Sequence, residues 1–195
     1  MAAFRTLDDL GDVSGKRALV RVDLNVPMQD GRVSDDTRLR STLPTVTELA
    51  DKGAIVLILA HFGRPKGPSP EFSLAQVTGA YQQVLGRPVR YVDWERDQAD
   101  VAELQPGDVA ILENTRFFGG EEKNDPAVVE RFARLGDLYV NDAFSAAHRA
   151  HASTEGLAHV LPAYAGRAMS PSLRILASSA ARRRTTQPSS SASLG

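Results

Sequence analysis

The chain has 195 residues, 42% of them hydrophobic, and a formal net charge of -1. This length suits one domain of ordinary size or slightly more. The lack of cysteine excludes disulfides, thiolate metal ligands and cysteine nucleophiles, and it favours a cytoplasmic location. We expect no signal peptide, because MAAFRTLDDLGDVSGKR at the start has no apolar region, and no membrane span, because no run approaches about 18 apolar residues.

The predicted elements alternate between short β-rich runs and longer helical patterns. The predicted strands are 17–23, 54–60, 89–92, 108–114 and 137–142, and the predicted helices are 35–53, 73–86 and 125–136. Pro44 predicts that the first helix is kinked or restarts there. The alternation predicts an α/β fold, a parallel sheet flanked by helices, in which the apolar run AIVLILA at 54–60 is covered on both faces.

The ends of the predicted helices have their own signals. Ser73 precedes the second helix as a plausible N-cap, and Gly86 is placed to end it. Asp125 occupies the N-cap position of the third helix and is followed by Pro126 in the first turn. These signals support helices at both positions.

Charge is distributed unevenly along the chain. Residues 1–169 hold 19 Lys and Arg and all 24 Asp and Glu, which gives -5, whereas residues 170–195 hold four Arg and no acid, which gives +4. An acidic body argues against general nucleic-acid binding, so any positive site must be local. Only four of the 23 basic residues are lysines. This bias fits either gripping of carboxylates and phosphates or a GC-rich genome.

Polar side chains follow the predicted strands, where ligands bind in open α/β sheets. At or just beyond the strand ends lie Asp23 and Asn25 for the first strand, His61 and Arg64 for the second, Asn114 and Arg116 for 108–114, and Asn141, Asp142, His148, Arg149 and His151 for the last. Arg38 lies in the segment after the first strand. Arginines gathered in an acidic protein predict a small, highly charged acid as ligand, such as a phosphate with a carboxylate.

Each feature also has a plainer interpretation. A single arginine at a strand end is usually a surface salt bridge. We expect no metal at HRAH (148–151), because no third ligand is evident. GDVSGKR (11–17) precedes a strand instead of following one, so it is not a phosphate-binding loop. GGEEKNDP (119–126) is most simply a solvated turn.

Five segments, taken in order, resemble successive signatures of the phosphoglycerate kinase family. They are RVDLNVP (21–27), SDDTRLR (34–40), AHFGRPKG (60–67), LENTRFFGGEEKNDP (112–126) and YVNDAFSAAHRAHAST (139–154). The resemblance covers about residues 4–169, which corresponds to the Rossmann-like N-terminal domain of a two-domain enzyme. The departures are mild: Phe62 stands where leucine is usual, and FSAAHR stands where FGTAHR is common.

The resemblance implies a glycolytic enzyme that transfers a phosphoryl group between 1,3-bisphosphoglycerate with Mg-ADP and 3-phosphoglycerate with Mg-ATP. It implies a monomer without nucleic-acid or membrane partners. The substrate-binding residues carried over by motif are Asp23, Asn25, Arg38, His61, Arg64, Arg116 and Arg149. The resemblance places Arg38 nearest the transferred phosphoryl group, as the catalytic residue. Asp23 and Asn25 would hold the substrate hydroxyl and orient the arginines.

The sequence departs from the family after AGRAM (165–169). Residues 170–195 include eight serines and no acid, so their composition predicts disorder. We expect residues 1–169 to form the phosphoglycerate-binding domain and 170–195 to be a low-complexity tail, read out of frame or belonging to a genuine short variant. Without the family's second domain this chain would have no nucleotide site and no turnover alone.

Three hypotheses about function remain open. The chain is the N-terminal part of a phosphoglycerate kinase, or a non-catalytic module that binds 3-phosphoglycerate, or a nucleic-acid-associated fragment that uses the basic ARRRTTQ segment (181–187). Restored turnover with the second domain in trans would favour the first, and steeply salt-dependent DNA binding would favour the third.

Overall fold

The structure is a computed structural model that describes residues 5–93, 96–143 and 149–169. The elements are β1 (Arg17–Arg21), β2 (Met28–Gln29), β3 (Arg32–Val33), α1 (Thr37–Asp51), β4 (Ile55–Leu59), α2 (Ala75–Leu85), β5 (Val89–Val92), α3 (Asp97–Ala102), β6 (Val109–Leu112), α4 (Pro126–Ala133), β7 (Leu138–Asn141), α5 (Leu157–Val160) and β8 (Ala163–Ala165). Short 3-10 turns occur at Leu7–Asp9, Pro70–Phe72, Thr115–Phe117 and Glu121–Lys123, and a π-helical turn at Ala152–Gly156.

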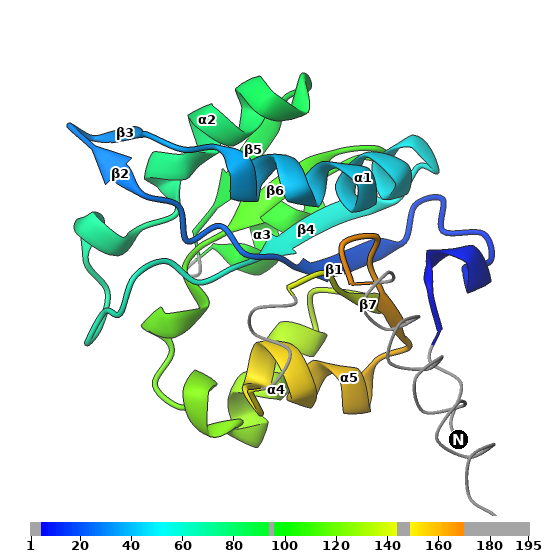
Figure 1. Cartoon of the computed structure of the whole chain (residues 1–195). Coiled ribbons are helices and arrows are strands. Elements are labelled where there is room, and N and C mark those ends of the chain that lie inside the picture. The colour runs from blue at the N-terminus through cyan, green and yellow to red at the C-terminus, as the bar shows by residue number, and fades with distance from the viewer. Residues whose placement is uncertain (1–4, 94–95, 144–148, 170–195) are drawn as a thin grey trace, which may run out of the picture.

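A six-stranded sheet forms the centre of the domain, in the order β5-β6-β4-β1-β7-β8. Its described pairings are all parallel, and Val20 of β1 lies between Ile58 and Val140 in register. Beside the sheet, β2 and β3 form a small antiparallel hairpin. The predicted α/β fold with a parallel sheet is therefore confirmed (Figure 1).

Helices cover both faces of the sheet (Figure 1). Side chains alternate along a strand, so Ala18 and Val20 join the core beneath α1 and α2, whereas Leu19 joins the core beneath α3, α4 and α5. Both cores are apolar and almost fully buried. Arg21 follows Leu19 by two residues, and this alternation directs its side chain toward the face that α4 covers.

Helix α1 runs through Pro44 as one element, so of the two predicted alternatives, a kink or a restart, the restart is wrong. Proline removes one helical hydrogen bond. Pro44 is exposed here, so water can bond the carbonyl that loses its partner. The buried side chains Leu39, Val46 and Leu49 hold the opposite side of the helix against the sheet. Tertiary packing thus keeps the helix continuous.

The other predicted helix ends agree closely with the structure. Gly86 ends α2 in the left-handed conformation, and Asp125 caps α4 by accepting a hydrogen bond from the Ala127 amide. Ser73 accepts from the Ala75 amide at the start of α2, although the formal N-cap is Leu74. The sequence did not predict α3, β8 or the β2–β3 hairpin, which are short and weakly patterned.

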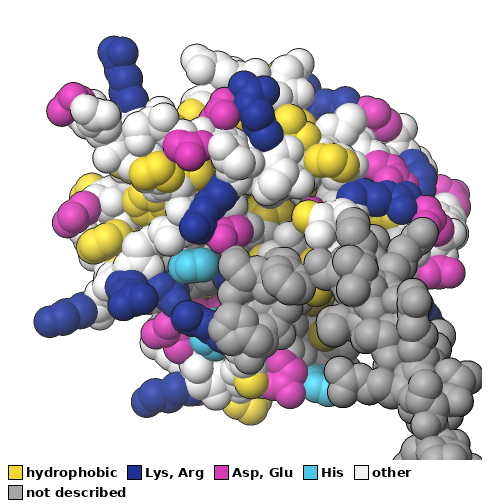
Figure 2. Space-filling model, in the orientation of Figure 1, with side chains coloured by type: hydrophobic (Ala, Val, Ile, Leu, Met, Phe, Trp, Pro, Cys, Tyr) yellow, Lys and Arg dark blue, Asp and Glu magenta, His cyan; other side chains and the backbone are white. Residues whose placement is uncertain are grey.

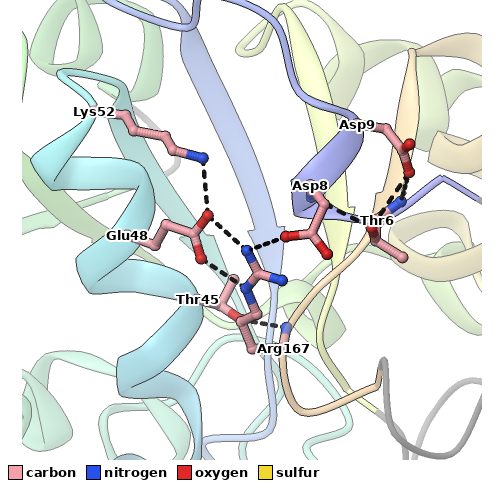
Figure 3. Close-up of polar contacts among 7 residues, drawn as sticks. All are labelled: Thr6, Asp8, Asp9, Thr45, Glu48, Lys52 and Arg167. Carbon is pink, nitrogen blue, oxygen red and sulfur yellow. Dashed lines mark hydrogen bonds and ion pairs between the residues drawn. The ribbon is translucent and has the colours of Figure 1, made fainter.

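Arg167 ties the last described segment to the body of the domain (Figure 3). Its guanidinium donates to both carboxylate oxygens of Glu48 on α1, at 2.6 and 2.8 Å, and pairs with Asp8 at 2.8 Å. Its amide donates to Thr45 at 2.8 Å. Hydrogen bonding from Arg167 lowers the pKa of Glu48. These contacts join three segments that lie far apart in the sequence.

Helices in the described residues are too short or too polar to cross a lipid bilayer.

Candidate functional site

A cavity of about 300 Å³ opens at the carboxyl-terminal edge of the sheet. Its lining comprises Arg21, Asp23, Asn25, Arg38, His61, Gly63, Arg64, Arg116, Arg149 and His151. All seven residues that the sequence predicts for substrate binding are in this set. Figure 2 shows basic and histidine side chains gathered on one face of the domain.

The sheet brings these residues together because its strands are parallel. The strands β1, β4 and β6 are paired side by side, so the loops that follow them begin at the same edge. The loops after β1 and β4 lead to α1 and α2 on one face, whereas the chain after β6 leads to α4 on the other. The space where these loops diverge is the cavity.

The loop after β4 is held in place by hydrogen bonds from both sides. Gly63 donates its amide to Asn25 at 2.8 Å, and its carbonyl accepts from the Arg116 guanidinium at 2.6 Å. Gly63 has a φ of +62°, and a Cβ there would lie 2.4 Å from the ring of Phe72. Glycine is therefore required at this position, and the loop is a rigid bridge between two site residues.

Asn114 lies two residues beyond the end of β6 and also holds the loop after β4 in place. Its side-chain amide donates to the carbonyls of Phe62 and Phe72, at 2.8 and 2.9 Å. Its oxygen accepts from the Arg116 amide at 3.1 Å. Asn114 is fully buried and does not line the cavity, so its contribution is to fix the residues that do.

Two of the arginines at the cavity are paired with carboxylates. Arg38 donates to Asp23 at 2.9 Å, and Arg116 pairs with Glu122 at 2.9 Å. Asp23 also accepts from the Asn25 amide, which fixes its carboxylate in the loop after β1. Arg64 and Arg149 are exposed at the cavity, and neither forms an ion pair with a described residue.

Arg21 is a site residue that the sequence analysis missed. It is 1% exposed, within β1, and its guanidinium donates to Ser153 at 3.0 Å, to the carbonyl of Val22 and to Nδ1 of His61 at 3.0 Å. The available signal was an arginine inside an otherwise apolar strand. A charged residue is rarely buried without partners, so an arginine at this position predicts a polar site next to the strand.

His61 is neutral in this arrangement. Burial, followed by the charges of Arg21 and Arg116, lowers its pKa to about 3. Its Nδ1 therefore accepts from Arg21, which has no acceptor atom of its own, and the proton lies on Nε2. His61 contributes a hydrogen-bond donor to the cavity without contributing a positive charge.

His151, one of the polar residues after the last predicted strand, also lines the cavity. Burial lowers its pKa. His148, the other histidine of the HRAH motif, lies outside the described residues. In the described part of the chain, no three His, Asp or Glu side chains are arranged to hold a metal ion.

The prediction that 119–126 is a solvated turn is wrong for Glu121. This residue is 1% exposed, and its carboxylate accepts from the hydroxyl and the amide of Ser153, at 2.5 and 3.1 Å. The two residues are 32 positions apart, so no local pattern shows the contact. The exposed Glu122 beside it conforms to the prediction.

The cavity is strongly positive. Its lining holds five arginines and one aspartate, which leaves four positive charges while the histidines are neutral. Fixed guanidinium groups bind carboxylates and phosphates through paired hydrogen bonds. The fold and the site together define an α/β domain with a cationic cavity at the carboxyl edge of its sheet.

Comparison with known proteins gives the family. The phosphoglycerate kinase family model matches residues 7–189. A phosphoglycerate kinase of Novosphingobium aromaticivorans is 73% identical over 175 residues, covering 89% of this chain and 44% of that protein. One of Zymomonas mobilis is 67% identical over 178 residues, with 89% and 45% covered. The chain belongs to the phosphoglycerate kinase family.

Solved structures agree with this assignment. The phosphoglycerate kinase of Coxiella burnetii superposes with a TM-score of 0.81 at 35% identity, covering 90% of this chain and 44% of that one. The enzyme of Pyrococcus horikoshii gives a TM-score of 0.79 at 34% identity. The chain spans about 45% of the length of the relatives that it matches.

Proposed function

We propose that the cavity binds 3-phosphoglycerate and 1,3-bisphosphoglycerate, the phosphoglycerate partners of the phosphoglycerate kinase reaction. In that reaction a phosphoryl group moves between the acyl phosphate of 1,3-bisphosphoglycerate and Mg-ADP. Residues 1–169 would form the phosphoglycerate-binding domain and 170–195 a low-complexity tail. Mg-ATP or Mg-ADP is the second substrate, which the family's other domain would hold. The setting would be the cytoplasm, and the chain monomeric.

The observation that carries this proposal is the gathering of five arginines around one cavity of about 300 Å³ in a protein that is acidic over residues 1–169. Such a cluster is unfavourable unless an anion neutralises it. A compact acid that carries both phosphate and carboxylate meets that need with two groups that guanidinium binds well.

The residues would divide the work. Arg64, Arg116 and Arg149 would hold the anionic groups, and Asp23 and Asn25 would hold the substrate hydroxyl and orient the arginines. Arg38 would face the transferring phosphoryl group. Charge spreads over the oxygens of that group in the transition state, so a positioned guanidinium helps most there. Because the attacking group is already a carboxylate or a phosphate, no general base is required.

Calorimetric titration of the 195-residue chain with 3-phosphoglycerate tests the binding. We expect saturable binding that is stronger than binding of inorganic phosphate, because the carboxylate adds a second anchor. Arg64→Ala should weaken it. The matched control is Arg87→Ala, which removes an arginine paired with Asp51 that is not among the residues of the cavity. Binding no tighter than that of phosphate, or equal losses in both variants, would refute the proposal.

A second candidate is a module that binds 3-phosphoglycerate without chemistry. The cavity supports it as well, because the described residues account for binding of the acid and none of them is assigned to the nucleotide. Both candidates predict binding. Only the first predicts that turnover appears when the remaining part of a relative is supplied.

A further inference from the structure

A buried chain of hydrogen bonds leads from Glu121 to the cavity. The Ser153 hydroxyl donates to Glu121 at 2.5 Å and accepts from Nε of Arg21 at 3.0 Å. Arg21 in turn reaches Nδ1 of His61 at 3.0 Å. Glu121 and Ser153 are no more than 1% exposed and do not line the cavity, whereas Arg21 and His61 do. These hydrogen bonds therefore connect the carboxylate of Glu121, outside the cavity, to the imidazole of His61 inside it.

Each bond in this chain has one direction. Glu121 as a carboxylate only accepts, so the hydroxyl proton of Ser153 points toward it and an oxygen lone pair faces Arg21. Arg21 only donates, so Nδ1 of His61 is an acceptor and Nε2 bears the proton. Among the described residues no group accepts from Nε2, so this N–H is available to a ligand.

The buried charges also depend on one another. Burial lowers the pKa of Arg21, and the charge of Glu121 acts in the opposite direction. Burial raises the pKa of Glu121, and the Ser153 hydrogen bond and the charge of Arg21 oppose that shift. Removing one member leaves the others desolvated without compensation. Without Ser153 the guanidinium loses the acceptor for its Nε, and without Glu121 it loses the opposing charge that acts on it most strongly.

We propose that Glu121 and Ser153 are positioning residues, which hold the Arg21 guanidinium against His61 so that the imidazole stays neutral and offers its Nε2–H to the bound acid. The inference rests on the proposed function for the identity of that acid. Neither residue lines the cavity. Their action on the ligand passes through Arg21 and His61.

The imidazole signals of His61, followed by ¹⁵N NMR in the 195-residue chain without ligand, test the first part. We expect the wild-type ring to be protonated on Nε2 and neutral from about pH 8 to about pH 5, because its pKa is far below the usual value. In Ser153→Ala the guanidinium is no longer held, so the part of the shift that the charge of Arg21 causes should shrink and the pKa of His61 should rise, while the part caused by burial remains. Charged groups that also act on His61, namely Asp23, Arg116 and Arg149, are unchanged in this variant.

Titration with 3-phosphoglycerate tests the second part. Ser153→Ala should weaken binding about tenfold, the value of one charge-assisted hydrogen bond. Glu121→Gln should act in the same direction, because one end of the amide is a donor and cannot accept from Ser153 as the carboxylate does. The control is Thr42→Val, which removes another buried hydroxyl, bonded to Tyr81 at 2.6 Å between α1 and α2. Thr42→Val should leave both the His61 signals and the binding unchanged.

The outcomes separate this inference from the proposed function. Failure of the wild type to bind 3-phosphoglycerate refutes the proposed function, and the ligand-free spectra still decide whether Arg21 is positioned as described. A wild-type ring that carries its proton on Nδ1, or that titrates near pH 6.5, overturns the inference even if Ser153→Ala does not fold. Unchanged His61 signals in folded Ser153→Ala and Glu121→Gln overturn it as well.

Discussion

At the scale of single residues, the arginines of the cavity differ in whether a carboxylate of the protein is paired with them. Arg38 is paired with Asp23, and its side chain is half exposed. Arg149 is exposed and forms no ion pair with a described residue. A guanidinium without a carboxylate partner gains most from a bound anion. The two residues should therefore respond differently to substitution.

We predict that Arg149→Ala weakens binding of 3-phosphoglycerate by about tenfold to a hundredfold, as expected for a lost charge-assisted contact. Arg38→Ala should barely change binding, yet abolish turnover once the rest of the enzyme is supplied, because it would act on the transferring group. Calorimetry measures the first effect and a coupled ATP assay the second. Equal binding losses in the two variants would contradict this division of roles.

At the scale of elements, the buried carboxylate of Asp142, directly after β7, binds the segment that follows β8. Asp142 is 5% exposed, accepts from the Ala168 amide at 2.9 Å, and has one oxygen without a partner among the described residues. Burial raises its pKa to about 6, above the ordinary 3.8. The folded chain therefore binds this proton more tightly than the unfolded chain does. The stabilisation is complete below about pH 3.8 and is lost as pH rises through about 6.

We predict that Asp142→Asn removes this pH dependence, because asparagine keeps an acceptor for the Ala168 amide and does not titrate. Relative to the variant, the wild type should lose about 2–3 kcal/mol of unfolding free energy between about pH 4 and pH 7. Urea unfolding at several pH values measures it. Asp12→Asn, the loss of an exposed carboxylate, is the control. Parallel stability profiles for wild type and Asp142→Asn would show that the buried acid does not titrate in this range.

At the scale of the whole molecule, the proposed function assigns the described cavity to one partner of a two-substrate reaction. The chain spans about 45% of its relatives, and phosphoryl transfer requires a nucleotide held in line with the acceptor, with water excluded. The residues at the cavity are mostly cationic. If they hold the phosphoglycerate as proposed, the nucleotide has to be positioned opposite them.

We predict that the 195-residue chain alone forms no ATP from 1,3-bisphosphoglycerate and Mg-ADP. Adding the remaining residues of the Novosphingobium aromaticivorans relative as a separate polypeptide should produce measurable turnover in a coupled assay. The same mixture with Arg38→Ala is the control and should be inactive. ATP formation by the chain alone, above the level of a protein-free blank, would contradict the prediction.

The sequence by itself determined the parallel α/β fold, most helix ends and the seven predicted residues that line the cavity. Apolar runs and capping residues are local signals, and the motifs occur in the family's order. Tertiary structure decided what local signals do not contain. It placed Arg21 against Ser153, 132 positions away, and Ser153 against Glu121, so that a turn that looks solvated holds a buried acid. It also kept α1 continuous through Pro44. Buried charges find partners across space, and the free energy that decides their positions comes from packing and desolvation, which the local sequence does not show.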